Sequence, residues 1–404
     1  MIRELSNIVQ PYAWGSHRAL AQLRGEAEPT SKPEAELWMG AHPLAPSRFM
    51  AGGESLPSAI DSAPAEYLGA RVQHEYGAKL PFLLKVLAAD TPLSLQAHPS
   101  IEQARRGFAA EVAAGIPLEA AHRNYKDQNH KPELLCALCE FWALCGFREV
   151  RRTLQLLDTL GLAELLPYRA LLAAEPNENG ISKAFSALMQ APAEHARPLA
   201  LATTQACQAR LGQPGPFADE RRWVERLGEL YPGDIGVVSS LLLNLVRLAP
   251  GEAVYLPAGN LHAYLGGTGV EIMASSDNVL RGGLTPKHVD AAELLRVLDF
   301  RPLHVEPQRP VVREREHVYA TPAREFCLSY FDCASTNADE SLDIALDGPE
   351  IWLVTQGHFE LTDAAGPPLT LTATRSAFVT AATGRLQLRG NGRIFRARVA
   401  PAGP

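Results

Sequence analysis

Residues 251–265 read GEAVYLPAGNLHAYL, and this stretch decides what fold the sequence predicts. The apolar run up to residue 256 predicts a β-strand, and Pro257 and Gly259 then predict a turn. A second strand follows from residue 261. Because successive side chains of a strand point to opposite faces, His262 and Tyr264 should share one face, and the apolar residues beside them should line the other. The His262 imidazole is therefore expected to project from a short, otherwise mostly apolar strand.

The spacing of this stretch resembles the second motif of the cupin superfamily. That motif has a glycine, five residues, a proline, one residue, a glycine, two residues and a histidine, which is the order found from Gly251 to His262. The asparagine expected four residues further on is Gly266 in this chain. The resemblance implies cupin-type jelly-roll barrels, and an imidazole directed into such a barrel is suited to bind a metal.

A second segment, LSLQAHP at residues 93–99, alternates in the same way. In a strand, Ser94, Gln96 and His98 would project from one face. The first cupin motif normally has a histidine where Gln96 stands, followed within a few residues by a glutamate. No glutamate follows at that spacing here, and the next carboxylate in a suitable strand is Glu133 in NHKPELL.

This departure points to one branch of the cupins, since the chain resembles the type I phosphomannose isomerases over most of its length. The stretches that carry the resemblance are PYAWGS (11–16), ELWMGAHP (36–43), PFLLKVLAADTPLSLQAHPS (81–100), NHKPELLCAL (129–138), LPAGNLHAYL (256–265) and GVEIMASSDNVLRGGLTPKHVD (269–290). The resemblance implies a metal-dependent aldose–ketose isomerase that interconverts mannose 6-phosphate and fructose 6-phosphate through an enediol. It also implies one Zn²⁺ per chain, held by Gln96, His98, Glu133 and His262. These ligand types would also accept manganese, iron or cobalt.

The texture of the chain predicts a mostly β protein with a helical insertion: two β-domains plus one α-helical domain. We expect a discontinuous metal-binding domain (1–148 plus 237–305), a helical insertion (149–236) and a C-terminal jelly roll without metal (306–404), where His358 has no partner at ligand spacing. Strands are expected at 81–89, 93–98, 131–138 and 140–147, and after the insertion at 241–248, 252–256, 261–267 and 269–275. A helix is expected at 100–115, with Ser100 as its N-cap.

Four residues are candidates for proton transfer, and the sequence does not rank them. Lys131 would share a strand face with Glu133, whereas His130 would naturally point the other way. Glu271, in GVEIMAS, would carry a lone carboxylate on the inner face, which is costly to bury without a partner; the alternative is a solvent-facing strand residue. Asp277 follows in the next loop.

The loop SSDNVLRGGLTPKH (275–288) contains Arg281 and Lys287, whose charges suit a phosphate, and Gly282 and Gly283, which let the backbone bend closely around something. A solvated basic loop is the alternative. The resemblance assigns both basic residues to the substrate end of the site: Arg281 to the enediolate or phosphate, and Lys287 to the phosphate.

Further polar and aromatic residues near these motifs are assigned more loosely. Tyr264 and Ser94 are candidates for binding the sugar. Trp14 could line the pocket or belong to the core. His42 is interpreted as structural, and the role of Glu36 is left open.

The composition is that of an ordinary globular protein: 404 residues, 46% hydrophobic, 21% charged and a net charge of −7. No basic stripe, secretory signal or membrane span is visible, so we expect a phosphosugar as the partner and neither nucleic acid nor membrane. Cys136, Cys139 and Cys145 are interpreted as buried thiols in a reducing compartment, which predicts a cytoplasmic protein. A monomer or weak homo-oligomer is expected.

Two other functional classes compete with the isomerase. A metal-dependent oxygenase of the cupin type would normally have more imidazole ligands than Gln96 permits. A sugar-binding regulatory protein would keep Arg281 and Lys287 and catalyse nothing. All four candidate ligands are present in this chain, which argues against the second class.

Overall fold

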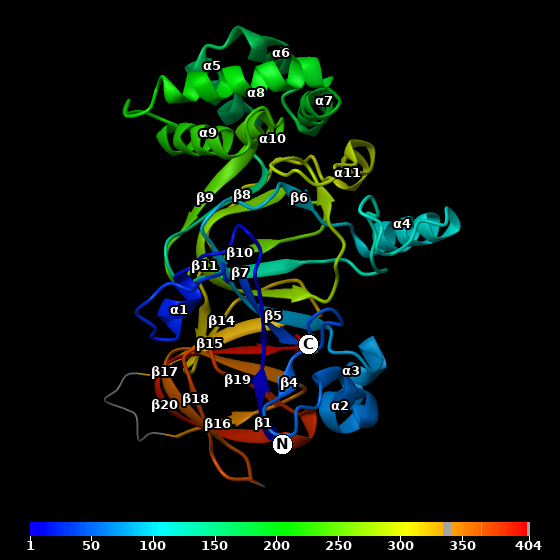
Figure 1. Cartoon of the computed structure of the whole chain (residues 1–404), viewed down its shortest axis with the longest axis vertical. Helices are drawn as coiled ribbons and strands as arrows, with labels where there is room; N and C mark the ends of the chain where they lie inside the picture. Colours follow the sequence, from blue (N-terminus) through cyan, green and yellow to red (C-terminus); the bar gives the residue numbers. More distant parts are fainter. Residues whose placement is uncertain (334–340, 365, 402–404) are drawn as a thin grey trace.

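The structure is a computed structural model that describes residues 1–333, 341–364 and 366–401. It has three parts, stacked from top to bottom in Figure 1: a helical block, a β-sheet that carries the motifs, and a second β-sheet. Within the described residues each sheet has ten strands, and its pairings are antiparallel. The mixed architecture therefore contains the two β-rich parts and the helical insertion that the sequence predicts.

The sheet that carries the motifs is built around one long strand. Its path is β10-β7-β11-β5-β3-β2, and four more strands attach along β11 through β6 and β8. The strands of this sheet are β2 (Ile8–Gln10), β3 (Glu36–Gly40), β5 (Phe82–Ala89), β6 (Gln96–Ala97), β7 (Glu133–Ala137), β8 (Phe141–Phe147), β9 (Leu243–Leu248), β10 (Ala253–Leu256), β11 (His262–Ala274) and β12 (Leu280–Arg281).

Two strands differ from the prediction. The segments expected at 261–267 and 269–275 form the single strand β11, because glycines stand where its neighbours come closest. A Cβ on Gly267 would lie 2.7 Å from the Glu140 carbonyl oxygen, and one on Gly269 would lie 2.8 Å from that of Cys136. Conversely, β6 is only two residues long. Pro92 and Pro99 flank this segment and lack the N–H that a ladder needs.

The helices fall into a block between β8 and β9 and a set at the edges of the sheets. The block contains α5 (Val150–Leu160), η1 (Ala163–Leu165), α6 (Leu166–Ala174), α7 (Glu178–Met189), α8 (Ala193–Gln208), α9 (Ala218–Leu230), α10 (Gly236–Ser239) and η2 (Ser240–Leu242). The others are α1 (Ala19–Leu23), α2 (Leu56–Ser62), α3 (Pro64–Tyr76), α4 (Ile101–Ala113), α11 (Ala291–Val297) and η4 (Ala381–Thr383). Ser100 caps α4 as predicted: its side chain accepts from Gln103 N, and the Gln103 side chain accepts from Ser100 N.

The second sheet combines the C-terminal strands with two strands from the start of the chain. Its path is β13-β14-β15-β20-β17-β19-β1-β4, with β16 on β20 and β18 on β17. Its strands are β1 (Ile2–Ser6), β4 (Arg48–Phe49), β13 (Val311–Arg313), β14 (Glu316–Val318), β15 (Cys327–Cys333), β16 (Leu342–Ala345), β17 (Glu350–Thr362), β18 (Leu369–Thr372), β19 (Ser376–Val379) and β20 (Arg385–Arg398). In Figure 1 the blue strand β1 lies among these strands. The predicted domain division placed β1 and β4 with the first block.

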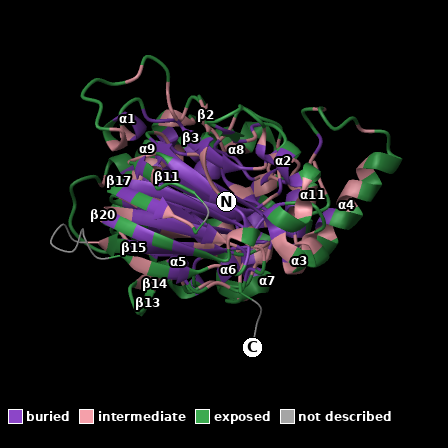
Figure 2. Cartoon of the chain, turned by 90° about the horizontal axis from the view of Figure 1, so that it is seen from below, coloured by how far each residue is buried: buried purple, intermediate pink, exposed green. Residues whose placement is uncertain are grey.

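The two sheets share one apolar core, so the central strands of the motif-bearing sheet are buried on both faces. Leu84, Leu134 and Ile272 point from β5, β7 and β11 into a cluster that also contains Leu353 and Phe395 of the second sheet. Their sequence neighbours on the opposite face are charged, yet also buried: Lys85, Glu133 and Glu271. Figure 2 shows buried strands at the centre of the molecule, β11 among them, and α4 largely exposed at the edge. The second sheet therefore forms a rigid backing for the charged face.

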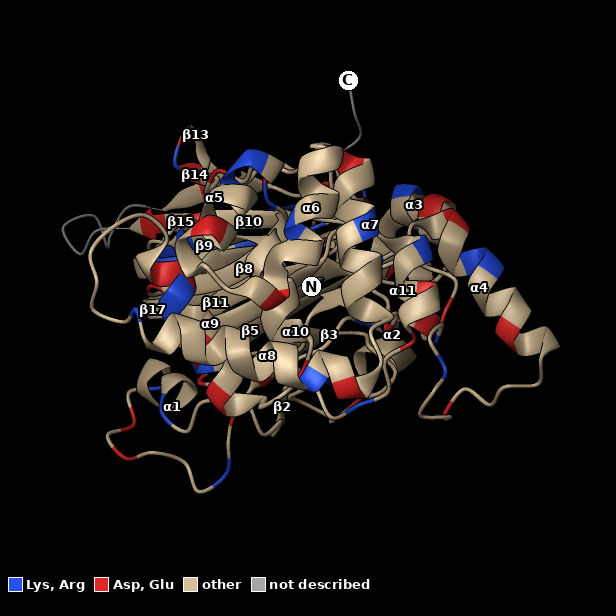
Figure 3. Ribbon diagram, turned by 90° about the horizontal axis from the view of Figure 1, so that it is seen from above, with Lys and Arg blue, Asp and Glu red and all other residues tan. Residues whose placement is uncertain are grey.

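Charges on the helices seen in Figure 3 are of both signs and interspersed. No helix in the described ranges is both long and apolar enough to cross a membrane. The prediction for the cysteines is wrong at one position, because Cys136 and Cys145 are buried but Cys139 is exposed. Cys139 follows the end of β7 in a turn, where strand alternation no longer applies.

Candidate metal centre

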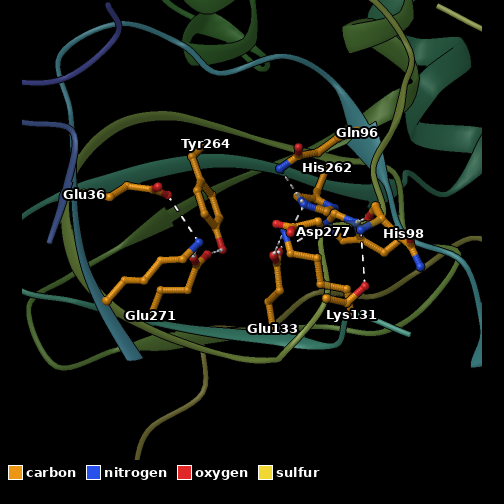
Figure 4. A network of polar contacts seen from close by, with 12 residues as sticks. Glu36, Gln96, His98, Lys131, Glu133, His262, Tyr264, Glu271 and Asp277 are labelled. Carbon is orange, nitrogen blue, oxygen red and sulfur yellow. Dashed lines mark hydrogen bonds and ion pairs between the residues drawn. The ribbon is translucent and has the colours of Figure 1, made fainter. Parts of the chain in front are cut away.

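Two imidazoles and one carboxylate meet on the charged face of the first sheet. His98, Glu133 and His262 are all buried, and one ligating atom from each lies within 4.8 Å of the others. Glu133 begins β7, His262 begins β11 and His98 follows β6, so three strand ends converge on one point (Figure 4).

Hydrogen bonds to the backbone fix the tautomer of both histidines. His98 Nδ1 lies 2.6 Å from the carbonyl oxygen of Asn278, and His262 Nδ1 lies 3.0 Å from that of Asn260. A carbonyl oxygen can only accept, so each Nδ1 carries the hydrogen and each Nε2 presents a lone pair. This is the arrangement in which metal-binding histidines are held in proteins.

The lone pairs face a carboxylate whose second oxygen has no partner. Lys131 Nζ lies 2.9 Å from Glu133 Oε1. Within the described part of the chain, Glu133 Oε2 and His98 Nε2 are buried without a hydrogen bond. The nearest His–Glu distances are 3.5 Å from His98 Nε2 to Oε1 and 3.4 Å from His262 Nε2 to Oε2. A buried acceptor without a hydrogen-bond donor lowers the stability of the folded state. A cation bound between these acceptors would remove that penalty.

The pKa shifts agree with a ligand set that is ready for a cation. Burial, together with the Lys131 charge, lowers the pKa of His98 to about 4, so this ring is neutral at neutral pH. Burial alone would raise the pKa of Glu133, but the Lys131 ammonium and the two imidazoles hold it well below its usual value. Neutral imidazoles and an ionised carboxylate are the forms that bind a divalent metal.

Gln96 completes the set predicted from the sequence. It pairs with His262 across β6 and β11, and its Nε2 lies 3.4 Å from His262 Nε2. A half-turn of the amide puts Oε1, an oxygen ligand, in that position.

A second buried network lies beside the first, on the left of Figure 4. Lys85 Nζ lies 3.1 Å from Glu271 Oε2 and 3.4 Å from Glu36 Oε1. Tyr264 donates its hydroxyl hydrogen to Glu271 at 2.8 Å, and Trp38 Nε1–H donates to Glu36 at 2.8 Å. Burial would lower the pKa of Lys85, but the two carboxylates outweigh it and raise the pKa, so Lys85 is charged. Lys85 is therefore the partner that the lone carboxylate of Glu271 required.

Two other candidates for proton transfer are placed differently. Asp277 is 36% exposed, and its Oδ2 lies 3.2 Å from Nε2 of the buried His42. Burial raises the pKa of Asp277, but the His42 hydrogen bond and the charges of Lys131 and Lys85 lower it overall. His130 Nε2 instead lies 2.7 Å from Glu325, so this geometry gives no support for proton transfer by His130.

The predicted phosphate residues lie close together at one edge of the site. Arg281 pairs with Gln96 across β12 and β6, and burial lowers its pKa. Lys287 is exposed, and its pKa is lowered by partial burial and by the Arg281 charge. Ser94 is half-buried two residues before Gln96. Trp14 packs against the cluster that contains Tyr264.

Comparisons with known proteins identify the family to which this chain belongs. Residues 2–150 match the family model "Phosphomannose isomerase type I, catalytic domain". Mannose-6-phosphate isomerase of Escherichia coli K12 is 40% identical over 401 residues, covering 98% of this chain and 99% of the relative. The chain belongs to the type I phosphomannose isomerases.

Other members of the type I phosphomannose isomerases extend the match. The human mannose-6-phosphate isomerase is 32% identical and covers 91% of this chain and 89% of its own. A crystal structure of the Salmonella typhimurium enzyme bound to the substrate f6p and zinc superposes with a TM-score of 0.90 at 39% identity, covering 99% of this chain and 100% of that one. A mannose 6-phosphate isomerase bound with zinc and yttrium gives the same score at 38% identity, with the same coverage.

Proposed function

We propose that this protein is a metal-dependent isomerase that interconverts mannose 6-phosphate and fructose 6-phosphate through an enediol. The observation that carries the proposal is the convergence of His98 Nε2, His262 Nε2 and Glu133 Oε2 on one buried point. Family membership and the zinc and f6p bound by a Salmonella relative support the choice of metal and substrate.

The metal would be held by His98, Glu133 and His262, with the Gln96 carbonyl oxygen as the fourth ligand. We propose one Zn²⁺ per chain, as in the zinc-bound relatives. A divalent ion supplies Lewis-acid stabilisation of the negative charge that develops on the sugar oxygens. The backbone carbonyls at positions 260 and 278 keep both rings turned toward that ion.

The basic edge of the site would hold the phosphate. Arg281 offers a planar guanidinium fork and Lys287 a mobile ammonium group, and together they would fix one end of the open-chain sugar. Ser94 and Tyr264 would contact its hydroxyl groups. Such anchoring keeps the reacting carbons in register with the catalytic groups.

Proton transfer between C2 and C1 is assigned first to Asp277. Its carboxylate is ionised at neutral pH and is the most exposed of the carboxylates near the metal centre. Glu271 and Lys131 each lie in a buried ion pair, which leaves them less able to exchange a proton. Their proposed roles are to set the charge balance around the enediolate. A positioned general base typically contributes 10²- to 10⁴-fold in rate.

We also propose that both β-rich parts are cupin-type jelly rolls and that the chain divides as predicted from its sequence, except that β1 and β4 join the C-terminal part. The two ten-stranded antiparallel sheets support this architecture. A cytoplasmic location and a monomeric or weakly associated state stay predictions.

The experiment that tests the function replaces His262. Because His262→Ala removes one of the two imidazole ligands, we expect less than one-tenth of the wild-type zinc content and at least a 10³-fold loss of kcat/KM in a coupled isomerase assay. His130→Ala is the matched control, since that imidazole pairs with Glu325 outside the cluster. Wild-type protein stripped by a chelator should lose activity and regain it with zinc. Full turnover by His262→Ala would refute the proposal.

A further inference from the structure

Asn278 is fully buried and uses its side chain to tie two loops together. Its Oδ1 accepts hydrogen bonds from Lys126 N at 2.7 Å and Asp127 N at 3.2 Å. Its Nδ2 donates to the carbonyl oxygens of Asp127 at 2.9 Å and Asn129 at 2.8 Å, and to Asp127 Oδ1 at 3.2 Å. The amide therefore has no capacity left for a substrate or a metal.

Asp127, in loop 126–129, forms side-chain hydrogen bonds back to loop 276–278. Its carboxylate accepts from Ser276 Oγ at 2.9 Å, from Asp277 N at 2.8 Å and from Asn129 N at 2.8 Å. Loop 126–129 and loop 276–278 are thus cross-linked by both side chains. Charge-assisted bonds of this kind are the stronger ones in proteins.

Both cross-linked loops lead directly to metal-centre residues. The Asn278 carbonyl oxygen accepts the hydrogen of His98 Nδ1 at 2.6 Å, so its position sets the tilt of that ring. Loop 126–129 runs through Lys131 into Glu133 at the start of β7. The same Asp127 carboxylate holds the backbone N–H of Asp277. The side chains of Asp127 and Asn278 therefore fix the backbone on both sides of the metal centre: the group that orients His98 and the segment that leads to Glu133.

We propose that the Asp127–Asn278 cross-link is a positioning device for the metal centre. Neither side chain touches a ligating atom; both act through the backbone groups that orient His98 and deliver Glu133. This inference rests on the proposed function, because it requires that the centre bind a metal. Residues that orient metal ligands typically change affinity 10- to 100-fold when replaced.

The test compares zinc affinities of full-length variants by competition with a chromophoric chelator. Asn278→Ala removes the Asn278 half of the cross-link and leaves the backbone carbonyl group in place, so we expect zinc binding to weaken 10- to 100-fold. The absorption bands of the Co²⁺-loaded protein should also shift, because the ligands relax. Asp127→Asn, which keeps the side-chain volume, should weaken zinc binding in the same direction.

Two matched controls separate positioning from stability. Gln128→Ala removes an exposed side chain from the same loop and leaves the cross-linking side chains in place. Asn7→Ala breaks a side-chain link between Ser47, which precedes β4, and Ser376 of β19, and should lower the melting temperature of the metal-free protein. Both controls should bind zinc and show the Co²⁺ spectrum as the wild type does.

Each outcome decides one question. Wild-type zinc affinity and an unchanged Co²⁺ spectrum in Asn278→Ala would overturn the inference. If Asn278→Ala does not fold, Asp127→Asn decides in the same way. A wild-type protein that binds no zinc would instead overturn the proposed function.

Discussion

At the residue scale, the site depends on which atoms are left without partners. Each imidazole gives one nitrogen to a backbone carbonyl and keeps the other for a ligand, and Lys131 occupies only one of the two Glu133 oxygens. The hydrogen-bond pattern leaves the unpaired atoms directed toward one another. Because these atoms are buried and unpaired, their protonation should affect the stability of the metal-free protein, and this effect can be measured.

The metal-free protein should lose stability in mild acid because of His98. Its pKa is about 4 in the folded state, against an ordinary value of 6.5 in the unfolded chain, so the unfolded state binds more protons between these values. The stabilising contribution is present above pH 6.5 and is lost as the pH falls toward 4. We expect the free energy of unfolding in urea to fall by about 2 kcal/mol from about pH 7 to about pH 5 through this residue.

The control for that experiment is His98→Gln, which removes the titrating ring. Its pH dependence over the same interval should be smaller than that of the wild type by about the same 2 kcal/mol. Equal slopes for the two proteins would contradict the assignment.

The buried ion network gives a second prediction at this scale. Lys85→Met leaves Glu36 and Glu271 without their shared cation, so we expect the free energy of unfolding to fall by about 3–5 kcal/mol. Urea unfolding of the metal-free protein measures this change in the free energy of unfolding. The matched variant is Lys79→Met, because Lys79 is exposed on the loop before β5 and should change stability by less than about 0.5 kcal/mol. A Lys85→Met protein as stable as Lys79→Met would show that the network contributes nothing.

Residues in motifs were predictable from the sequence, and residues that depend on register were not. Gln96, His98, Glu133 and His262 each stand in a recognisable motif, and the structure brings all four together. Lys85 was missed because its partner is set by the pairing of β5 with β11, where Glu271 lies opposite it. The signal was present: a lysine inside the apolar run PFLLKVLAA needs a buried partner. Asn278 was missed because its bonds cross between two loops.

At the element scale, glycine decides where strands and loops can approach each other. The sequence suggested that Gly282 and Gly283 bend around a ligand, but the structure shows Gly283 against the end of the helical block. A Cβ on Gly283 would lie 2.7 Å from Asp234 Oδ1 and 2.8 Å from Gly236 Cα. Asp234 also accepts from Thr285 N at 3.2 Å. The helical block therefore anchors the loop between Arg281 and Lys287.

Gly283→Ala should displace this loop and weaken substrate binding. Its φ of +117° is strained for alanine, and there is no space for the new methyl group. We expect KM for the phosphosugar to rise by roughly tenfold to a hundredfold, with zinc content unchanged. Gly25→Ala is the control, since Gly25 also has a positive φ but nothing within 4 Å of its Cβ position. An unchanged KM would show that the anchor does not position the basic residues.

At the scale of the whole molecule, the shared core joins the two sheets into one unit. The sequence predicted two β-domains, but alternation alone could not show that the apolar faces of β5, β7 and β11 pack against the second sheet. Nor could it show that β1 belongs to that sheet, because Leu5 pairs with Ser376 at the far end of the chain. Such long-range pairing leaves no local pattern.

A cavity in the shared core should therefore destabilise both sheets at once. Phe395 is fully buried in the second sheet, and Phe395→Ala should lower the free energy of unfolding by about 3–5 kcal/mol. The urea midpoints of two transitions, the loss of the near-ultraviolet circular dichroism signal and the release of zinc, should both move to lower urea concentration by the same amount. Loss of the dichroism signal before any zinc is released would contradict a common transition.

The pairing of β1 with β19 also bears on how the protein is made. A ribosome extends a chain at about 5–20 residues per second, so β1 waits on the order of tens of seconds for its neighbour to be synthesised. During that interval the apolar faces of β5 and β7 lack the part of their cluster that the second sheet supplies. The nascent chain therefore keeps part of this apolar surface exposed until β17, β19 and β20 have been synthesised, so the core shared by the two sheets is completed only near the end of translation.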